Sequence, residues 1–210
     1  MNWKQLISAK RFGMEEFHEE RQENRSEFQR DYDRLIFSAP FRRLQNKTQV
    51  FPLPGSVFVH NRLTHSLEVA SVGRSLGDDV AKALLERHPE LQDSFLPEIG
   101  SIVSAACLAH DLGNPPFGHS GEKAISTFFS EGKGVRLKEK QPNGEQLSPM
   151  EWEDLTHFEG NANAFRILTH QFEGRRRGGF VLTYSTLASI VKYPLSLIHI
   201  SEPTRRSYIS

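Results

Sequence analysis

Apolar residues recur at helical spacing along most of this chain, which predicts a mainly all-α fold. The apolar run 102–109 is too long and too rich in alanine for a typical strand, so it predicts a buried helix. An amphipathic helix is predicted upstream, with apolar positions at Leu63, Leu67, Ala70, Leu76, Val80 and Leu84. A further helix, striped by Phe28, Tyr32, Leu35 and Ile36, should end near Pro40, because the residue before a proline is pushed out of the helical region.

Two segments interrupt this helical pattern. β-Branched and aromatic residues predict a short hairpin or extended segment over residues 48–59. Glycine, proline and polar residues dominate 132–149, which predicts a plain surface connection rather than a lid over a substrate. Ser148, Pro149 and Glu151 then carry the signature of a capping box that starts a helix. Another helix is predicted over residues 161–171, with a core face of Ala164, Phe165 and Leu168.

The end of the 102–109 run carries a candidate metal site. His110 and Asp111 follow the apolar residues directly, so both side chains should leave the end of a rigid helix. Neutral imidazole and carboxylate together suit a first-row divalent ion, which needs further ligands from other elements. His65, on the amphipathic helix, is the candidate for a third ligand. A lone His-Asp dipeptide is most often an accident of sequence, and the additional polar residues in compatible contexts favour the metal site.

A second polar pair follows in the same part of the chain. His119 and Glu122 are three residues apart at the start of an apolar-periodic stretch, so on a helix they share a face and can meet. A histidine and a carboxylate in contact suit general acid–base work on a water or a leaving oxygen. Pro115 and Pro116 must break the preceding helix, because proline removes a backbone donor and clashes with the turn before it. The break should carry the second pair back over the metal.

Several blocks of the chain resemble the deoxynucleoside triphosphate triphosphohydrolases of the HD superfamily, known as the dGTPase family. The blocks are residues 30–37, 41–51, 61–66, 110–119, 158–162 and 182–188. The resemblance covers residues 1 to 194 and implies a partial HD-domain helical fold over that range.

This resemblance implies three sets of site residues. The metal ligands are His65, His110 and Asp111. The acid–base or phosphate-protonating pair is His119 with Glu122. The substrate contacts are Gln45, Arg62, Asn114 and His157. Arg62 suits this role because a guanidinium can fork onto phosphate oxygens.

The resemblance also implies a reaction and a cofactor. Enzymes of this family hydrolyse dGTP or other dNTPs to the deoxynucleoside and tripolyphosphate, with Mg²⁺ or Mn²⁺. Mixed His and Asp ligation itself suits Mn²⁺, Co²⁺, Fe²⁺ or Zn²⁺ better than Mg²⁺, which prefers an all-oxygen shell. Two alternatives stay open: another HD phosphohydrolase, such as a nucleotidase or cyclic-nucleotide phosphodiesterase, and an inactive nucleotide-binding fragment.

The C-terminal part bears on whether the metal site is complete. The family places a fourth ligand, an Asp, well downstream, yet no Asp follows Asp154 in this sequence. Asp154 precedes the 158–162 block and is therefore not at the family's position. Residues 195–205 match the in-frame translation of a transposase-type sequencing adapter, so 195–210 are expected to be non-native. We expect residues 1–194 to be a truncated N-terminal part with impaired or absent activity.

Composition and charge set the remaining expectations. The 210 residues are 37% hydrophobic and 25% charged with a formal net charge of +0, which shows no bias toward nucleic acid or membrane. No segment approaches the ~18 unbroken apolar residues of a membrane span, and the N-terminus lacks a signal-peptide core, so a cytoplasmic location is expected. The basic run 175–177 is typical of a solvated turn more than of a nucleic-acid contact. The family resemblance implies a homo-oligomer for the full-length form, and Cys107 is expected to be a small core residue.

Overall fold

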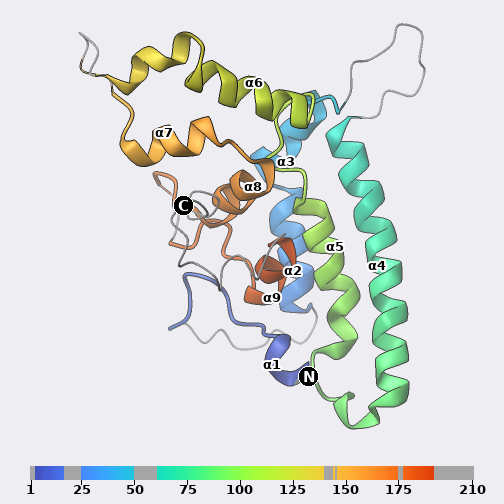
Figure 1. Cartoon of the computed structure of the whole chain (residues 1–210). Helices are drawn as coiled ribbons and strands as arrows, with labels where there is room; N and C mark the ends of the chain where they lie inside the picture. Colours follow the sequence, from blue (N-terminus) through green and yellow to red (C-terminus); the bar gives the residue numbers. More distant parts are fainter. Residues whose placement is uncertain are drawn as a thin grey trace, which may run out of the picture.

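The computed structural model describes residues 3–16, 25–49, 61–139, 144, 146–174 and 177–191, and within these ranges it contains helices and two isolated antiparallel bridges but no strand. The α-helices are α1 (Trp3–Leu6), α2 (Glu27–Ile36), α3 (Ala39–Arg43), α4 (Arg62–Arg87), α5 (Ile99–Ala109), α6 (His119–Ser130), α7 (Pro149–Thr156), α8 (Gly160–Thr169) and α9 (Tyr184–Ile190). The 3-10 helices are η1 (Leu44–Asn46), η2 (Pro89–Leu91), η3 (Leu96–Glu98) and η4 (Lys133–Lys138). Figure 1 shows α4 along one side with α5 and then α2 beside it, and α6 and α7 paired at the end away from α1. The predicted all-α fold is confirmed.

The contact between α4 and α5 depends on small residues. The buried positions of α4 are Arg62, Ser66, Ala70, Gly73, Gly77 and Ala81. A Cβ atom added at Gly77 would lie 2.7 Å from the Cα atom of Gly100, so the two backbones approach closely there. Leu76 and Val80, predicted on the apolar face, are instead 60% and 50% exposed. That part of the predicted face is wrong, because glycine and alanine carry little hydrophobic signal yet allow the closest packing.

Gly77→Ala is expected to lower the free energy of unfolding by about 1–3 kcal/mol, the usual cost of overpacking. The new methyl group would meet backbone atoms of Gly100 and, at 3.2 Å, the carbonyl oxygen of Ile99, which cannot rotate away as a side chain can. Urea unfolding followed by circular dichroism measures the change. Ser75→Ala, on the exposed face of α4, is the matched control and should cost less than about 0.5 kcal/mol. Equal stability of the two variants would show that the helices have room to separate.

The helix α2 packs on α5 and confirms the predicted stripe. Phe28 and Leu35 are fully buried, while Tyr32 and Ile36 are partly buried against the core cluster that contains Leu35. The helix begins at Ser26, whose side chain accepts a hydrogen bond from the backbone N–H of the third helical residue. It ends at Ile36, close to the predicted boundary.

The helix α5 is central to the hydrophobic core and leads directly to the candidate site. Leu108, Ala109 and Leu112 are at most 1% exposed. Cys107 packs against this cluster as predicted, and burial raises the pKa of its thiol. On α8, Ala164 and Leu168 belong to the same core and Phe165 packs against it, so the predicted face of that helix is also confirmed.

The region between α6 and α7 is more ordered than predicted. Residues 133–138 form η4, and Gly134 packs against the ring of Phe128 on α6. The capping box at the start of α7 is confirmed, since Ser148 and Glu151 each accept a hydrogen bond from the other's backbone N–H. The plain-loop prediction for 132–149 is therefore wrong over the η4 residues, where the chain turns back onto α6.

Three predictions fall wholly or largely outside the described residues. These are the hairpin over 48–59, the adapter-derived segment 195–210, and the solvated turn at 175–177, of which two arginines are not described. Thr48 and Asn61, on either side of residues 50–60, form an antiparallel bridge. Among the helices that the structure describes, none has the length and apolar character needed to cross a bilayer.

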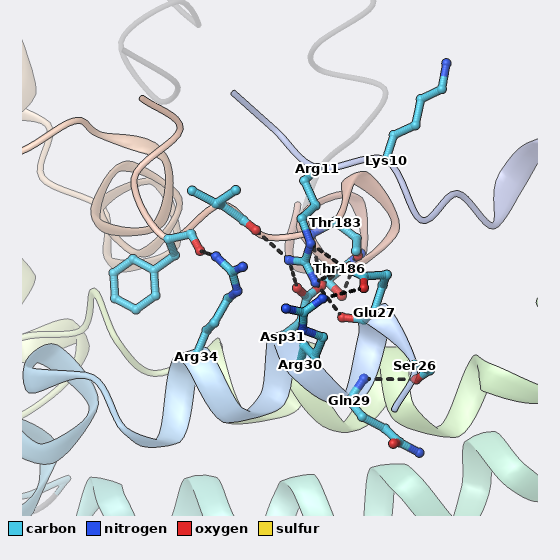
Figure 2. Close-up of polar contacts among 12 residues, drawn as sticks. Lys10, Arg11, Ser26, Glu27, Gln29, Arg30, Asp31, Arg34, Thr183 and Thr186 are labelled. Atoms are coloured by element: carbon cyan, nitrogen blue, oxygen red, sulfur yellow. Dashed lines mark hydrogen bonds and ion pairs between the residues drawn. The ribbon is translucent and has the colours of Figure 1, made fainter. Parts of the chain in front are cut away.

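A buried polar network joins the N-terminal segment, α2 and the start of α9 (Figure 2). The Arg11 guanidinium donates to Asp31 Oδ1 at 2.7 Å, to Glu27 Oε2 at 2.6 Å and to the carbonyl oxygen of Val181 at 2.6 Å. Asp31 Oδ2 accepts from the backbone N–H of Thr183 at 2.9 Å and from its hydroxyl at 2.7 Å. Asp31 is completely buried and Arg11 is 6% exposed. These bonds connect residues that lie far apart in the sequence, and hydrophobic periodicity gives no sign of them.

Candidate metal centre

The turn after α5 carries the first two candidate ligands. The helix ends at Ala109, and His110 and Asp111 follow it as predicted. The backbone N–H of Asn114 donates to the carbonyl oxygen of Asp111 at 3.2 Å, which closes the turn. Gly113 is needed because an added Cβ atom would lie 2.1 Å from backbone atoms of α8. The turn is thus held against both α5 and α8.

The structure brings the three predicted ligands together. His65, His110 and Asp111 each offer a ligand atom, and these atoms lie within 4.8 Å of one another. His65 comes from the first turn of α4, and its ring centroid is 5.3 Å from that of His110. Across the described ranges, this is the one cluster of His, Cys, Asp or Glu side chains close enough to hold a metal ion.

The orientation of the His110 ring is fixed by the backbone of α5. Its Nδ1 atom lies 2.6 Å from the carbonyl oxygen of Cys107. A carbonyl oxygen can only accept, so Nδ1 carries the proton and Nε2 keeps its lone pair. Metal-binding histidines show this arrangement, in which the second nitrogen donates to a neighbouring acceptor. The His110 side chain is 37% exposed, so Nε2 belongs to an accessible site.

Three neighbouring side chains hold the buried carboxylate of Asp111. Its Oδ1 atom accepts from Arg62 Nη1 at 2.8 Å and from Asn114 Nδ2 at 2.5 Å. Its Oδ2 atom has a longer contact, 3.4 Å, with Gln49 Nε2. Burial acts to raise the pKa of Asp111, but the hydrogen bond from Asn114 and the charge and hydrogen bond of Arg62 outweigh it and lower the pKa. The carboxylate is therefore ionised at neutral pH, as a metal ligand must be.

Gln49 also lies at this site, beside Asp111, and sequence analysis missed it. Gln45, the predicted substrate contact, is exposed on η1 and has no described bond to the cluster. Lys47 was also missed, although its Nζ atom lies beside the turn and donates to the carbonyl oxygen of Asn114 at 3.0 Å. Both residues belong to the 41–51 block, but which of its side chains faces Asp111 depends on the turn between η1 and Thr48, which the sequence pattern does not define.

The His119–Glu122 pair lies at the start of α6 and meets as predicted. His119 Nδ1 is 2.7 Å from Glu122 Oε2. The other carboxylate oxygen, Oε1, accepts from the backbone N–H of Gly160 at 2.8 Å. A Cβ atom added at Gly160 would lie 1.8 Å from Asn114 Oδ1 and 2.8 Å from Glu122 Oε1, so the pair lies next to Asn114 and through it to Asp111. Glu122 is 13% exposed, whereas the His119 side chain is 92% exposed and open to a substrate.

His157 lies apart from the three ligands. It follows the last turn of α7, where Nδ1 is 3.3 Å from Glu153 Oε1. It lines a cavity of about 200 Å³ between α7 and α8, and Asp154 and Glu159 line the same cavity. Asp154 does not join the metal cluster, in agreement with the sequence argument against it. A fourth ligand is not found among the described residues.

Comparison with known families and proteins gives a consistent result. The sequence profile described as HD domain matches residues 62–178, a range that contains the metal cluster and the His119–Glu122 pair. A Synechocystis protein named deoxyguanosinetriphosphate triphosphohydrolase-like protein is 50% identical over 194 residues, which is 92% of this chain and 43% of that protein. A Pseudomonas aeruginosa protein of the same name is 47% identical over 203 residues, 95% of this chain and 43% of the relative.

A Yersinia enterocolitica protein named deoxyguanosinetriphosphate triphosphohydrolase is 38% identical over 219 aligned positions, which cover 92% of this chain and 41% of the relative. The chain therefore spans less than half the length of these curated relatives.

Proposed function

The chain belongs to the HD domain family, and on that premise we propose that it supplies the metal-binding residues of an enzyme that hydrolyses dGTP, or dNTPs more broadly, to the deoxynucleoside and tripolyphosphate. The observation that carries the proposal is the approach of the His65, His110 and Asp111 ligand atoms to within 4.8 Å, beside the His119–Glu122 pair. The names of the relatives support a nucleoside triphosphate substrate. Because the chain covers 43% of the Synechocystis relative, the activity is proposed for a protein of the relatives' length.

The donor set fits a divalent metal ion. His110 has Nε2 available because Nδ1 is committed to the Cys107 carbonyl oxygen, and Asp111 is held ionised. We propose Mg²⁺ or Mn²⁺ as the cofactor, with His65, His110 and Asp111 as its ligands. Such an ion polarises a phosphoryl oxygen and lowers the pKa of a bound water.

The proposed role of His119 is general acid–base catalysis: it would give a proton to the leaving oxygen or take one from the attacking water. Glu122 can only accept at Oε2, so it fixes the His119 proton on Nδ1 and leaves Nε2 facing outward. Glu122 is itself fixed at Oε1 by the backbone N–H of Gly160. Asn114 lies between this pair and Asp111, which supports its proposed place in the substrate pocket. Substrate contacts from Gln45 and His157 remain predictions.

His119→Ala is expected to reduce kcat by about 10²–10⁴-fold, the usual contribution of a positioned acid or base. Its affinity for Mn²⁺ should stay unchanged, because His119 is not among the clustered ligand atoms. The rate of tripolyphosphate release gives kcat, and calorimetric titration gives the affinity for Mn²⁺. Ser120→Ala, at the exposed neighbouring position, is the control. Full activity in His119→Ala would remove this residue from the mechanism.

Product analysis tests the proposed reaction. A chimera that joins the matched part of this chain to the remainder of the Synechocystis relative supplies a protein of full relative length. With dGTP and Mn²⁺ or Mg²⁺, we expect deoxyguanosine and tripolyphosphate in equal amounts. Release of orthophosphate or of a nucleoside monophosphate would favour another HD phosphohydrolase. Nucleotide binding without products, while the unmodified relative turns over, would favour a binding role for this sequence.

The remaining parts of the proposal concern the cell and the assembly. We propose a cytoplasmic protein that forms a homo-oligomer at the relatives' length. Light scattering of the chimera after size-exclusion chromatography tests the assembly, and a monomer would contradict it.

A further inference from the structure

Two cationic side chains, those of Lys47 and Arg62, lie beside the candidate metal site. The two residues are neighbours in the structure, because the backbone N–H of Arg62 donates to the carbonyl oxygen of Lys47 at 3.1 Å. The bridge between Thr48 and Asn61 adjoins this bond. Both side chains are thereby brought to one place, the turn of residues 111–115 that follows α5.

Lys47 contacts the backbone of that turn. Its Nζ atom donates to the carbonyl oxygen of Asn114 at 3.0 Å and to that of Leu112 at 3.5 Å. Carbonyl groups that follow the end of a helix have no partner within the helix. Burial lowers the pKa of Lys47, and the positive charge of Arg62 lowers it further, while Asp111 opposes the shift. The ammonium group is thus held close to Asp111 by the carbonyl oxygens that it satisfies.

Arg62 contacts the turn through two of its nitrogens. Nη1 donates to Asp111 Oδ1 at 2.8 Å, and Nη2 donates to the carbonyl oxygen of Pro115 at 3.1 Å. Arg62 is 3% exposed, and its Nε atom is buried with no partner among the described residues. Both terminal nitrogens of the guanidinium thus donate to acceptors of the turn. The contacts are those of a residue that holds the turn.

We propose that Lys47 and Arg62 form a cation clamp that positions Asp111 and the 111–115 turn for metal binding. Arg62 and Asn114 both donate to Oδ1 of Asp111, the oxygen that lies 3.8 Å from His110 Nε2, so the clamp fixes the carboxylate beside the other ligands. The same turn carries Asn114 next to Glu122, so the clamp also sets the distance between the metal ligands and the His119–Glu122 pair. This inference rests on the metal site of the proposed function and gives Arg62 a positioning role, while its substrate contact stays a prediction.

If Lys47 or Arg62 is removed, a positioning role and a purely electrostatic effect predict opposite changes in metal affinity. Removal of a positive charge beside a cation site should strengthen cation binding by Coulomb's law. Loss of a group that orients a ligating carboxylate typically weakens metal binding by about 10–100-fold. A substrate-binding arginine would leave metal affinity unchanged or tighter and would raise only KM. The sign of the change in Mn²⁺ affinity therefore separates these roles.

Mn²⁺ alone, titrated calorimetrically into the 210-residue chain, provides the first measurement. Arg62→Ala and Lys47→Met should each bind Mn²⁺ about 10–100-fold more weakly than the unmodified chain. Arg62→Lys keeps the charge but cannot fork onto two acceptors, so it should restore part of the lost affinity. Arg43→Ala removes an exposed cation whose charge acts on Lys47, and it is the matched control that should not weaken binding.

Amide hydrogen exchange of the metal-free chain provides the second measurement. The amides of Leu112, Asn114, Phe117 and Gly118 are hydrogen-bonded in and beside the turn. They should exchange about tenfold faster in Arg62→Ala and Lys47→Met, and at the unmodified rate in Arg43→Ala. Lys47→Met retains the apolar stem, so it remains informative if Arg62→Ala fails to fold.

The outcomes distinguish the clamp from the metal site on which it rests. Unchanged exchange together with equal or tighter Mn²⁺ binding in Arg62→Ala and Lys47→Met would overturn the clamp. If the unmodified chain binds no Mn²⁺, the proposed metal centre of this chain fails, and exchange rates still decide whether the two cations hold the turn.

Discussion

His110→Ala is expected to abolish Mn²⁺ binding by the chain and, in the chimera with the Synechocystis relative, hydrolysis of dGTP. The described cluster offers three ligand atoms, and this change removes one of them. Changes to the residues that merely orient a ligand cost about 10–100-fold in metal affinity, so loss of a ligand should exceed that range. Calorimetric titration with Mn²⁺ and tripolyphosphate release give the two readouts. Asp111→Ala should have the same effect on both.

The two variants differ in what else they disturb. Asp111 is buried against Arg62, so Asp111→Ala leaves a buried charge without its partner and should also destabilise the fold. His110 is 37% exposed, so its removal should leave the melting temperature almost unchanged and gives the cleaner test. His88→Ala, at an exposed histidine beyond the end of α4, is the control. Retention of full Mn²⁺ affinity in His110→Ala would mean that the ion binds elsewhere and that the assigned ligand set is wrong.

The sequence predicted the parts of the site that depend on local pattern. An apolar run followed by a proline-containing break locates His110 and Asp111 at the end of a buried helix, and the structure has α5 end at Ala109. Spacing alone predicts the contact between His119 and Glu122, because residues three apart on a helix share a face. These features involve few residues and short separations along the chain. Propensity and periodicity are most informative at that scale.

What the sequence did not show depends on tertiary contacts with backbone atoms. Lys47 and Arg62 donate to carbonyl oxygens of the 111–115 turn. Every residue has a backbone carbonyl, so the residue types in the turn do not indicate these contacts. The approach of Gln49 to Asp111 depends on how the chain leaves η1. Along α4, the small buried residue Gly77 allows contact with α5, so a search for large apolar residues favoured the exposed positions Leu76 and Val80.

Asp31→Ala is expected to lower the free energy of unfolding by about 3–5 kcal/mol, the usual cost of breaking a buried ion pair from one side. Asp31 is completely buried and accepts from Arg11 and from both the N–H and the hydroxyl of Thr183. Its removal takes one acceptor from Arg11 and the acceptor of the Thr183 N–H, which weakens the attachment of α9 to α2 (Figure 2). Because small domains are stable by about 5–15 kcal/mol, a loss of this size should greatly increase the unfolded fraction. Urea unfolding followed by circular dichroism measures it.

Asp33→Ala, two residues along the same helix, is the matched control. Asp33 pairs with Arg25, but the two side chains are 29% and 60% exposed, and such pairs contribute about 0–1 kcal/mol. If Asp31→Ala does not fold, Asp31→Asn keeps an acceptor oxygen, removes the charge, and should give an intermediate loss. A cost for Asp31→Ala no larger than that for Asp33→Ala would show that Glu27 alone compensates Arg11. In that case the attachment of α9 would depend on core packing through Leu187 and not on the polar network.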